Sequence, residues 1–344
     1  MNTQIVKTDG ISLDAGALSK AAEILRGGGL VVFPTETVYG LGGDGTSAYA
    51  AKKIYEAKGR PSDNPLIIHV SSPEDAESYA VTNETYYKLA KAFMPGPLTV
   101  ILPKKETIPL SVTGGLDSVA VRCPSHPIAR QIISAAGIPV AAPSANLSGK
   151  PSPTCARHVI DDLSGRVDMI IDGGSCEIGL ESTIIKLDGN SATLLRPGAI
   201  TADALRCVCA SVDIAPAVLE QIKENERPLS PGMKYRHYAP SVPLILIDGE
   251  KKNVIDFLKN EQKQKKCAIL CYHEEMALLE NKNIMDIGSS SNLETQAQTL
   301  FTALRDADSF GVDVIYAHLP DKSGIGLALY NRMIRAAAHT VIKV

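Results

Sequence analysis

The stretch that decides the fold reads LVVFPTETVYGLG at residues 30–42 and continues, after a short gap, as AYAAKKIYEAKGRPSDNPLIIHV at residues 48–70. Apolar runs open and close it, and a segment with helical periodicity lies between them. This order predicts a strand, a polar loop, a helix, a basic loop and a second strand. Both loops can lie at one end of a sheet, where open α/β sheets bind their ligands. Hydroxyls, a carboxylate, two cations and an imidazole would then converge around a small, polar, partly anionic ligand.

The composition is that of a globular protein with room for about two domains. The chain has 344 residues, of which 44% are hydrophobic and 21% charged, and its formal net charge is −3. This charge excludes an overall basic field for nucleic acid or membrane. The N-terminus has no apolar signal core and no run could span a bilayer, so we expect a cytoplasmic protein with no membrane association. Seven cysteines without a C-x-x-C pair predict reduced thiols.

Outward from the opening stretch, residues 1–212 are predicted to form one domain. Apolar side chains at helical spacing predict a helix over 14–26, which ends at three glycines. The predicted strands come in pairs and do not alternate strictly with helices, which favours a mixed α/β sheet. Further strands are predicted over 98–102, 118–122, 138–142, 168–171 and 183–187.

The remainder of the chain divides into a linker and a second domain. Periodicity fades over 213–241, and the segment SPGMKYRHYAP at 230–240 is richer in Lys, Arg, His and Tyr than a passive spacer would be. We therefore expect the linker to contact something. Residues 242–344 alternate predicted strands and helices, which indicates a small parallel-sheet α/β domain.

Several charged residues have two interpretations when taken singly. Lys58 and Arg60 flank a glycine in a loop that suits phosphate oxygens, but a solvated basic loop is the plainer alternative. His69 lies within an apolar strand, where a hydrogen-bonded core histidine is the default. Arg122 and Arg196 each follow an apolar run and could be surface ion-pair partners.

Two polar loops are equally ambiguous. The glycines over 42–45 follow a predicted strand and weakly suggest phosphate binding, although a plain turn is as good an explanation. The pattern Ser144-x-Asn146-x-Ser148 could be local turn chemistry. Taken together, the strand-terminal loops favour binding of an anionic nucleotide and a polar small molecule. They do not favour covalent nucleophilic catalysis, since no Ser-His-Asp order is evident.

The chain resembles a known family in seven ordered motifs of its first domain. From residue 230 onward it resembles the longer, two-domain form of the threonylcarbamoyl-AMP synthases of the YrdC-like family. The similarity is dense from about residue 12 to 210 and rests mainly on the linker and the β-α pattern beyond it. The motifs are PTETVYGLG (34–42), KGRPSDNPLIIHV (58–70), MPGPLTVILP (94–103), VAVRCPSHP (119–127), APSANLSGKPSPT (142–154), ESTIIKL (181–187) and LLRPGAI (194–200).

The resemblance implies a fold and an activity. The fold would be a YrdC-like domain with an open, twisted mixed sheet and flanking helices, joined to a small Rossmann-like C-terminal α/β domain. The activity would be that of a nucleotidyltransferase that forms threonylcarbamoyl-AMP and pyrophosphate from L-threonine, bicarbonate or CO2, and ATP. Its product would feed the threonylcarbamoyladenosine modification beside the anticodon of tRNA, through downstream tRNA threonylcarbamoyl-transfer proteins. Mg²⁺ would be carried by ATP, with no metal site formed by the protein.

The resemblance also implies roles for single residues. Lys58 and Arg60 would be the catalytic cations, with Lys58 a phosphate partner. Threonine or its carbamate would be held by Thr35, His69, Arg122, Ala142 and Ser182. ATP would be held by Arg60, Asn64, Ser118, Ser144, Ser152, Arg196 and Tyr235.

Two further expectations concern the linker and an alternative function. Residues 213–241 would act as a lid over the active site, with Tyr235 on the nucleotide and the second domain anchoring the far end. The alternative is a non-catalytic module for double-stranded RNA or tRNA, in which phosphate contacts would dominate. The negative net charge argues against it, although weak tRNA or RNA binding stays compatible with the sequence.

Overall fold

The computed structural model describes residues 2–220, 237–279 and 282–344, and these divide into two compact units. The first unit holds the N-terminal part of the chain. The second holds the C-terminal part from residue 235 together with two short segments, 149–151 and 178–180. Most of the expected lid, including Tyr235, lies outside the described residues. Each unit is described separately below.

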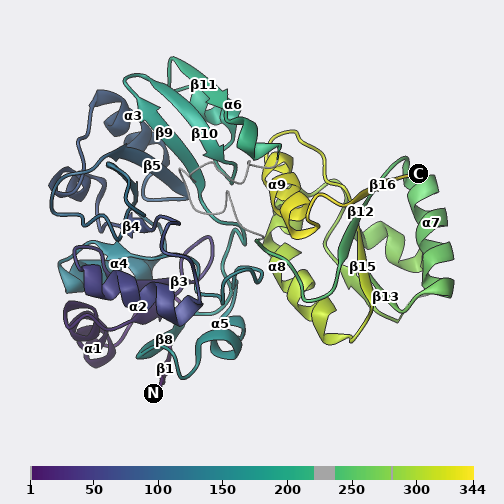
Figure 1. The fold of residues 1–344 in the computed structure, drawn as a ribbon, viewed down its shortest axis with the longest axis horizontal. Coiled ribbons are helices and arrows are strands. Elements are labelled where there is room, and N and C mark those ends of the chain that lie inside the picture. The colour runs from purple at the N-terminus through teal and green to yellow at the C-terminus, as the bar shows by residue number, and fades with distance from the viewer. Residues whose placement is uncertain (1, 221–236, 280–281) are drawn as a thin grey trace. The chain divides into compact units, whose positions relative to one another are not determined.

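The described part of the first unit is built on an eleven-stranded sheet (Figure 1). Parallel and antiparallel neighbours occur side by side: β4 runs parallel to β6, β6 antiparallel to β5, and β5 parallel to β9. The predicted mixed sheet is therefore confirmed. In spatial order the strands are β1 (Gln4–Lys7), β8 (Met169–Asp172), β2 (Val31–Phe33), β3 (Gly40–Asp44), β7 (Val140–Ala141), β4 (Ile67–His69), β6 (Ser118–Arg122), β5 (Leu98–Pro103), β9 (Thr183–Asp188), β10 (Ser191–Arg196) and β11 (Ser211–Ile214).

Helices of the first unit begin and end where their capping residues predict. The Asp14 side chain accepts hydrogen bonds from the first turn of α1, and Ser47 does the same for α2. The helix α2 ends at Gly59, whose φ of 61° is left-handed and suits a residue without Cβ. The helical segments are α1 (Ala15–Arg26), α2 (Ala48–Lys58), η1 (Pro73–Ser78), α3 (Glu84–Phe93), α4 (Pro127–Ala136), α5 (Ala156–Leu163), α6 (Ala202–Arg206) and η2 (Pro216–Val218).

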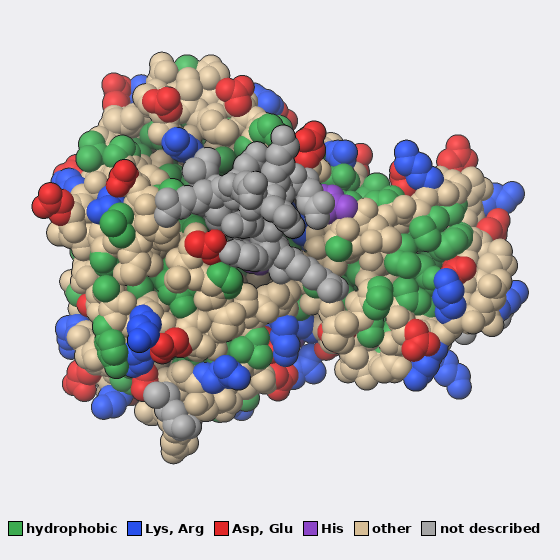
Figure 2. Space-filling view, in the orientation of Figure 1, with side chains coloured by type: hydrophobic (Ala, Val, Ile, Leu, Met, Phe, Trp, Pro, Cys, Tyr) green, Lys and Arg blue, Asp and Glu red, His purple; other side chains and the backbone are tan. Residues whose placement is uncertain are grey.

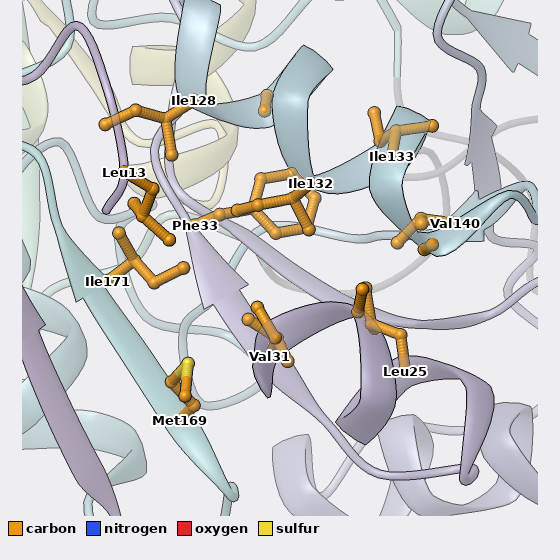
Figure 3. Close-up of a cluster of buried hydrophobic side chains, with 14 of the residues drawn as sticks. Leu13, Leu25, Val31, Phe33, Ile128, Ile132, Ile133, Val140, Met169 and Ile171 are labelled. Atoms are coloured by element: carbon orange, nitrogen blue, oxygen red, sulfur yellow. The ribbon is translucent and has the colours of Figure 1, made fainter. Parts of the chain in front are cut away.

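A hydrophobic core fixes two helices against one face of this sheet (Figure 3). Leu25 of α1 and Ile132 of α4 pack with Val31 and Phe33 of β2 and Ile171 of β8. All five side chains are fully buried. Burying each of them stabilises the fold by about 1.5–3 kcal/mol. This core holds β2 in place, and the PTETVYG segment, residues 34–40, follows directly from it.

The glycines over 42–45 correct an expectation. The sequence suggested a turn or a weak phosphate-binding loop, but Gly40–Asp44 is the buried strand β3, paired with β2 and β7. A Cβ on Gly42 would lie 2.6 Å from a ring carbon of Phe33 and 2.9 Å from a methyl of Val140. Gly42 therefore serves close packing between strands, whereas Gly45 lies in the turn that follows β3.

The second unit is a small parallel α/β domain, as the sequence predicted. Its sheet is entirely parallel in the described residues, and Figure 1 shows α7 on one face with α8 and α9 on the other. The strands in spatial order are β14 (Ile284–Asp286), β13 (Cys267–Cys271), β15 (Val314–His318), β12 (Leu244–Asp248) and β16 (Val341–Lys343). The helical segments are α7 (Lys251–Gln264), η3 (His273–Leu278), α8 (Leu293–Ser309) and α9 (Gly326–Ala336).

The described end of the linker is packed within this second unit. The Tyr238 ring is buried and stacks on Phe301 of α8, with centroids 5.4 Å apart. The Arg332 guanidinium carbon lies over the Tyr238 ring, 5.7 Å from its centroid. Tyr238 has a φ of 63°, which is uncommon for a residue with a side chain. The packing of the ring holds this backbone conformation in place.

On the face that Figure 2 shows, acidic and basic side chains are intermingled. No helix among the described residues is long and apolar enough to cross a membrane.

Candidate active site

Four polar side chains meet on one face of the first unit's sheet. The strands β4 and β6 are parallel neighbours, and His69 at the end of β4 is in register with Arg122 at the end of β6. Residues in register point to the same face of a sheet, so the two side chains lie side by side. Thr99 of β5 is opposite Arg122 on its other side, and its hydroxyl lies 2.7 Å from that of Ser182. Guanidinium, imidazole and two hydroxyls from four separate segments thus form one group, which we call the carboxyl-end cluster.

Arg122 is held by Glu36, a buried carboxylate to which the sequence assigned no role of its own. Its Nη2 lies 2.7 Å from Glu36 Oε1, and both side chains are only 5% exposed. Its Nε also donates weakly to the Gly96 carbonyl at 3.4 Å. Glu36 lies in the quoted PTETVYG motif, but its partner is 86 residues away, so the pair is visible only in the fold.

His69 is a neutral imidazole in this setting. Burial is the main cause that lowers its pKa, and the nearby Arg122 charge adds to the effect, so that the pKa falls from 6.5 to about 3. Its ring can therefore donate or accept a hydrogen bond at neutral pH but carries no charge. A neutral imidazole beside a guanidinium suits a hydroxyl or a carboxylate of a ligand.

Ser182 joins the cluster to two further predicted residues. Arg196 donates from Nε to the Ser182 carbonyl at 3.0 Å and from Nη2 to the Ser182 hydroxyl at 3.1 Å. One residue earlier, the buried Glu181 accepts a hydrogen bond from the Ser152 hydroxyl. Through Ser182 and its neighbour Glu181, the fold therefore brings Ser152 and Arg196 next to the carboxyl-end cluster.

Thr35 and Ala142 contribute in different ways. The Thr35 hydroxyl donates to the Val38 carbonyl at 2.6 Å and lies 2.9 Å from the Thr37 hydroxyl, so it shapes the turn that carries Glu36. Ala142 follows β7, and its backbone N–H donates to the Ile67 carbonyl at 2.9 Å. Its side chain is buried in the hydrophobic core cluster that also holds Phe33 and Val140.

A second polar group lies at the opposite, amino end of β4 and β6. Ser118 begins β6, and four residues of extended chain place it about 13 Å from Arg122. Asn64 precedes β4 and is buried, and the Arg60 guanidinium donates to the carbonyls of Asn64 and Pro65 at 3.3 and 3.0 Å. Arg60 also borders a surface hollow of about 510 Å³. We call these residues the amino-end cluster.

Lys58 has contacts that differ from those of a solvated cation. It is the last residue of α2 and only 3% exposed, and its ammonium donates to the carbonyls of Ser144 and Asn146. The Ser144 hydroxyl lies 2.6 Å from Asn146 Oδ1. Lys58 therefore holds the loop after β7 in place, next to the amino-end cluster.

Between the two clusters the same sheet face is apolar. Ile67, Ala120, Ile101, Ile184 and Leu195 form one small hydrophobic cluster across five strands. A ligand with polar groups at both ends and an apolar or aromatic middle would fit such a floor.

Three buried side-chain atoms in these clusters have no hydrogen-bond partner among the described residues. They are Glu36 Oε2, Asn64 Oδ1 and His69 Nδ1. Buried polar atoms are rarely left unpaired, and such atoms call for a specific explanation, which a bound ligand would supply.

The predicted residues thus separate into two clusters joined by the apolar floor, and Tyr235 alone lies outside the described residues. Glu36, Thr99 and Glu181 were missed. The alternation of Thr99 with Ile101 on its strand is a signal that could have found Thr99. Within the described residues no group of three or more His, Cys, Asp or Glu side chains could hold a metal ion.

Comparison with known proteins agrees with the motifs. Residues 23–198 match the Sua5/YciO/YrdC family model, described as "Telomere recombination", and residues 200–338 match the model for the C-terminal domain of threonylcarbamoyl-AMP synthase. The chain is 43% identical to the threonylcarbamoyl-AMP synthase of Bacillus subtilis, over 98% of this chain and 97% of that one. It is 45% identical to the enzyme of that name from Pyrococcus abyssi, over 94% and 95%.

A solved structure extends the likeness to the whole fold. The crystal structure of Pyrococcus abyssi Sua5 complexed with L-threonine matches with a TM-score of 0.91 at 42% identity, covering all of both chains. Two family models along the chain and relatives of this identity and coverage leave no ambiguity at the family level. The chain belongs to the Sua5/YrdC family, in its two-domain form.

Proposed function

We propose that this chain is an L-threonylcarbamoyladenylate synthase, a nucleotidyltransferase that converts L-threonine, bicarbonate or CO2, and ATP into threonylcarbamoyl-AMP and pyrophosphate. The observation that carries the proposal is the pair of polar clusters at the two ends of one apolar sheet face. A small amino acid fits the carboxyl-end cluster, and a nucleotide fits along the floor toward the amino-end cluster. Relatives named threonylcarbamoyl-AMP synthase and the threonine complex of Pyrococcus abyssi Sua5 support this assignment.

The carboxyl-end cluster would bind threonine or its carbamate. Arg122 is positioned to neutralise a carboxylate, and the neutral His69 to bind a hydroxyl or a carboxylate oxygen. The Ser182 hydroxyl adds a third polar contact. Thr35 and Ala142 would shape the wall on the side of β7.

ATP would lie across the apolar floor. Arg60, Asn64, Ser118 and Ser144 lie toward one end of the floor, whereas Ser152 and Arg196 lie near the threonine end. The α-phosphate has to meet the carbamate, so Arg196 is the cation best placed to neutralise it. Lys58, bonded to backbone carbonyls, would act by holding the Ser144 loop in place.

The reaction needs no protein nucleophile. The threonine amine captures CO2, a carbamate oxygen then attacks the α-phosphorus, and the bond to the pyrophosphate oxygen breaks. Catalysis is then positioning plus neutralisation of charge, as in phosphoryl transfer generally. Mg²⁺ would be held mainly by the triphosphate, where it would offset the charge of the leaving pyrophosphate.

The wider setting is part of the same proposal. We expect a cytoplasmic enzyme whose labile product passes to downstream tRNA threonylcarbamoyl-transfer proteins. Residues 213–214 belong to β11 and residues 216–218 to η2 of the first unit. We therefore expect the later part of the linker to close over the site as a lid and shield the carbamate from water. The packing of Tyr238 against Phe301 supports an anchored far end for such a lid.

Two measurements test the function. Pyrophosphate release should require L-threonine, bicarbonate and ATP together, and mass spectrometry should detect threonylcarbamoyl-AMP. Calorimetry should give saturable binding of ATP and threonine. If the protein instead binds duplex RNA with a steep salt dependence and neither small molecule, the non-catalytic RNA-binding alternative is correct and the enzyme proposal is wrong.

A further inference from the structure

Glu36 is a buried carboxylate with one oxygen still to be accounted for. It lies in the loop between β2 and β3 and is 4% exposed. Oε1 accepts a hydrogen bond from Arg122 Nη2 at 2.7 Å. Oε2 is buried without a hydrogen-bond partner in the described part of the chain. A buried carboxylate oxygen without a donor is costly, and next to the residues proposed to bind threonine a donor that arrives with the ligand would offset that cost.

The residues around Glu36 indicate which kind of donor is needed. Its neighbour Thr35 and its partner Arg122 both belong to the residues proposed to hold threonine. None of the residues in that set carries a negative charge: Thr35, His69, Arg122, Ala142 and Ser182. Free threonine reaches the site as a zwitterion, with an ammonium group as well as a carboxylate. The set therefore provides a cation for the carboxylate and polar groups for the hydroxyl, but it provides no anionic partner for the ammonium.

We propose that Glu36 Oε2 binds the α-ammonium group of L-threonine and accepts one proton from it when the carbamate forms. This inference rests on the proposed function and adds a specificity and proton-accepting residue to it. The contact between Arg122 and Glu36 Oε1 is consistent with this role of Glu36, because the guanidinium occupies one carboxylate oxygen and leaves the other for the ligand.

Glu36 takes one proton from the ammonium, which frees the nitrogen lone pair. That pair forms the N–C bond to CO2, and one C=O π pair moves onto oxygen as the carboxylate charge. The nitrogen then loses its second proton to water. Glu36 later returns its own proton to solvent, so that threonine and CO2 give the carbamate and two protons in all.

The test uses the full-length protein and two ligands that differ in one group. L-Threonine is compared with (2S,3R)-2,3-dihydroxybutanoate, in which a hydroxyl replaces the ammonium. In calorimetry the wild type should bind threonine at least ten-fold more tightly than the dihydroxy acid. Equal affinities for the two ligands in the wild type would overturn the proposal without recourse to any variant.

Variants then assign the discrimination to Glu36. Glu36→Gln should weaken threonine binding at least ten-fold and leave dihydroxybutanoate within about three-fold, because Gln retains an acceptor but no charge. Glu36→Asp should recover part of the loss. Glu275→Gln is the matched control, since Glu275 is also a buried carboxylate with one unpartnered oxygen, in the second unit. It should leave threonine binding unchanged.

The outcomes separate this inference from the proposed function. If the wild type makes threonylcarbamoyl-AMP and Glu36→Gln keeps both its affinity for threonine and its rate, the role of Glu36 is wrong and the function stands. If the wild type neither binds threonine nor releases pyrophosphate, the function fails, and the inference falls with it. Thermal unfolding of each variant confirms that a loss of binding is not a loss of fold, and Glu36→Asp remains informative if Glu36→Gln does not fold.

Discussion

Glu36 and Glu275 are buried carboxylates, one in each compact unit, and their settings differ. Glu36 pairs with Arg122, and Glu275 pairs with His318 at 2.7 Å, and in each pair the second carboxylate oxygen lacks a partner among the described residues. Glu275 lies beside a ring stack, because His318 lies 4.6 Å from Tyr272 and nearly parallel to it. Glu36 contacts the Arg122 guanidinium, and Arg122 is in register with His69 and Thr99 of the neighbouring strands.

The setting of each carboxylate, and not its burial, distinguishes the two. Burial and an unpaired oxygen are common to both carboxylates, so they cannot by themselves indicate function. Only Glu36 belongs to a group of polar side chains that converge from β4, β5, β6 and the segment before β9. We therefore interpret Glu36 as part of an active site and Glu275 as a structural pair that ties η3 to the end of β15.

The largest expected effect concerns substrate choice at the Glu36 region. A pocket that reads a hydroxyl with buried polar groups rejects a ligand without it by about 10⁴-fold, because the partners of that hydroxyl go unpaired. Threonine should therefore exceed valine by orders of magnitude in kcat/KM for pyrophosphate release. Serine should lose only a methyl contact, worth about 1–3 kcal/mol. Equal turnover of valine and threonine would contradict a pocket built on Thr35, His69 and Ser182.

The next effect separates the two buried pairs directly. Arg122→Met leaves Glu36 as an uncompensated buried charge, which should cost about 3–5 kcal/mol in the free energy of unfolding and abolish measurable synthesis. His318→Leu should destabilise the protein but keep pyrophosphate release per folded molecule within about two-fold of wild type. Arg206→Met is the control for arginine loss, since its pair with Asp203 is exposed.

Urea unfolding and initial rates, measured on the same samples, give the activity per folded molecule of each variant. If His318→Leu and Arg122→Met lose activity to the same degree per folded molecule, the distinction between a functional and a structural carboxylate is wrong.

A smaller effect is expected at the amino-end cluster. Arg60→Ala removes charged hydrogen bonds to the Asn64 and Pro65 carbonyls and a proposed phosphate contact, each worth on the order of 1.5–3 kcal/mol. Pyrophosphate release should fall by one to two orders of magnitude while the fold persists. Lys52→Ala is the control, because Lys52 borders the same hollow and its pair with Glu56 is exposed. Wild-type turnover of Arg60→Ala at saturating substrate would remove Arg60 from the site.

Much of the fold could be predicted from the sequence because its strands and helices carry regular patterns. The predicted strand over 118–122 coincides with β6, and the predicted helix over 14–26 matches α1 with Asp14 as its cap. The strand β3 was missed because a run of glycines has low strand propensity. Its glycines are explained only by Phe33 and Val140, which pack where their side chains would be.

The site could be predicted only in part, for a similar reason. The motifs identify Thr35, His69, Arg122 and Ser182 separately, but the sequence does not show which of these side chains contact one another. The role of Glu36 depends on a partner in another motif, and that of Lys58 on carbonyls more than eighty residues away. Contacts of this kind are made by the sheet order, which no local pattern encodes.

The last prediction concerns pH and the buried His69. Its pKa is about 3 in the folded protein and 6.5 when exposed, so the unfolded chain binds the extra proton between these values. Stability is therefore lost as the pH falls below 6.5, and at pH 5 this one group should cost about 2 kcal/mol relative to pH 7. Urea unfolding of His69→Gln should show a shallower acid dependence than wild type by that amount. His273→Gln is the control, because His273 is exposed and Asp286 raises its pKa, which gives the opposite sign: that contribution is present at low pH and is lost as the pH rises. An unchanged acid slope in His69→Gln would mean that the pKa of His69 is the same in the folded and unfolded protein, and a steeper slope would mean that folding raises this pKa. Either result would contradict a buried neutral imidazole, and the steeper slope would make His69 a second cation beside Arg122.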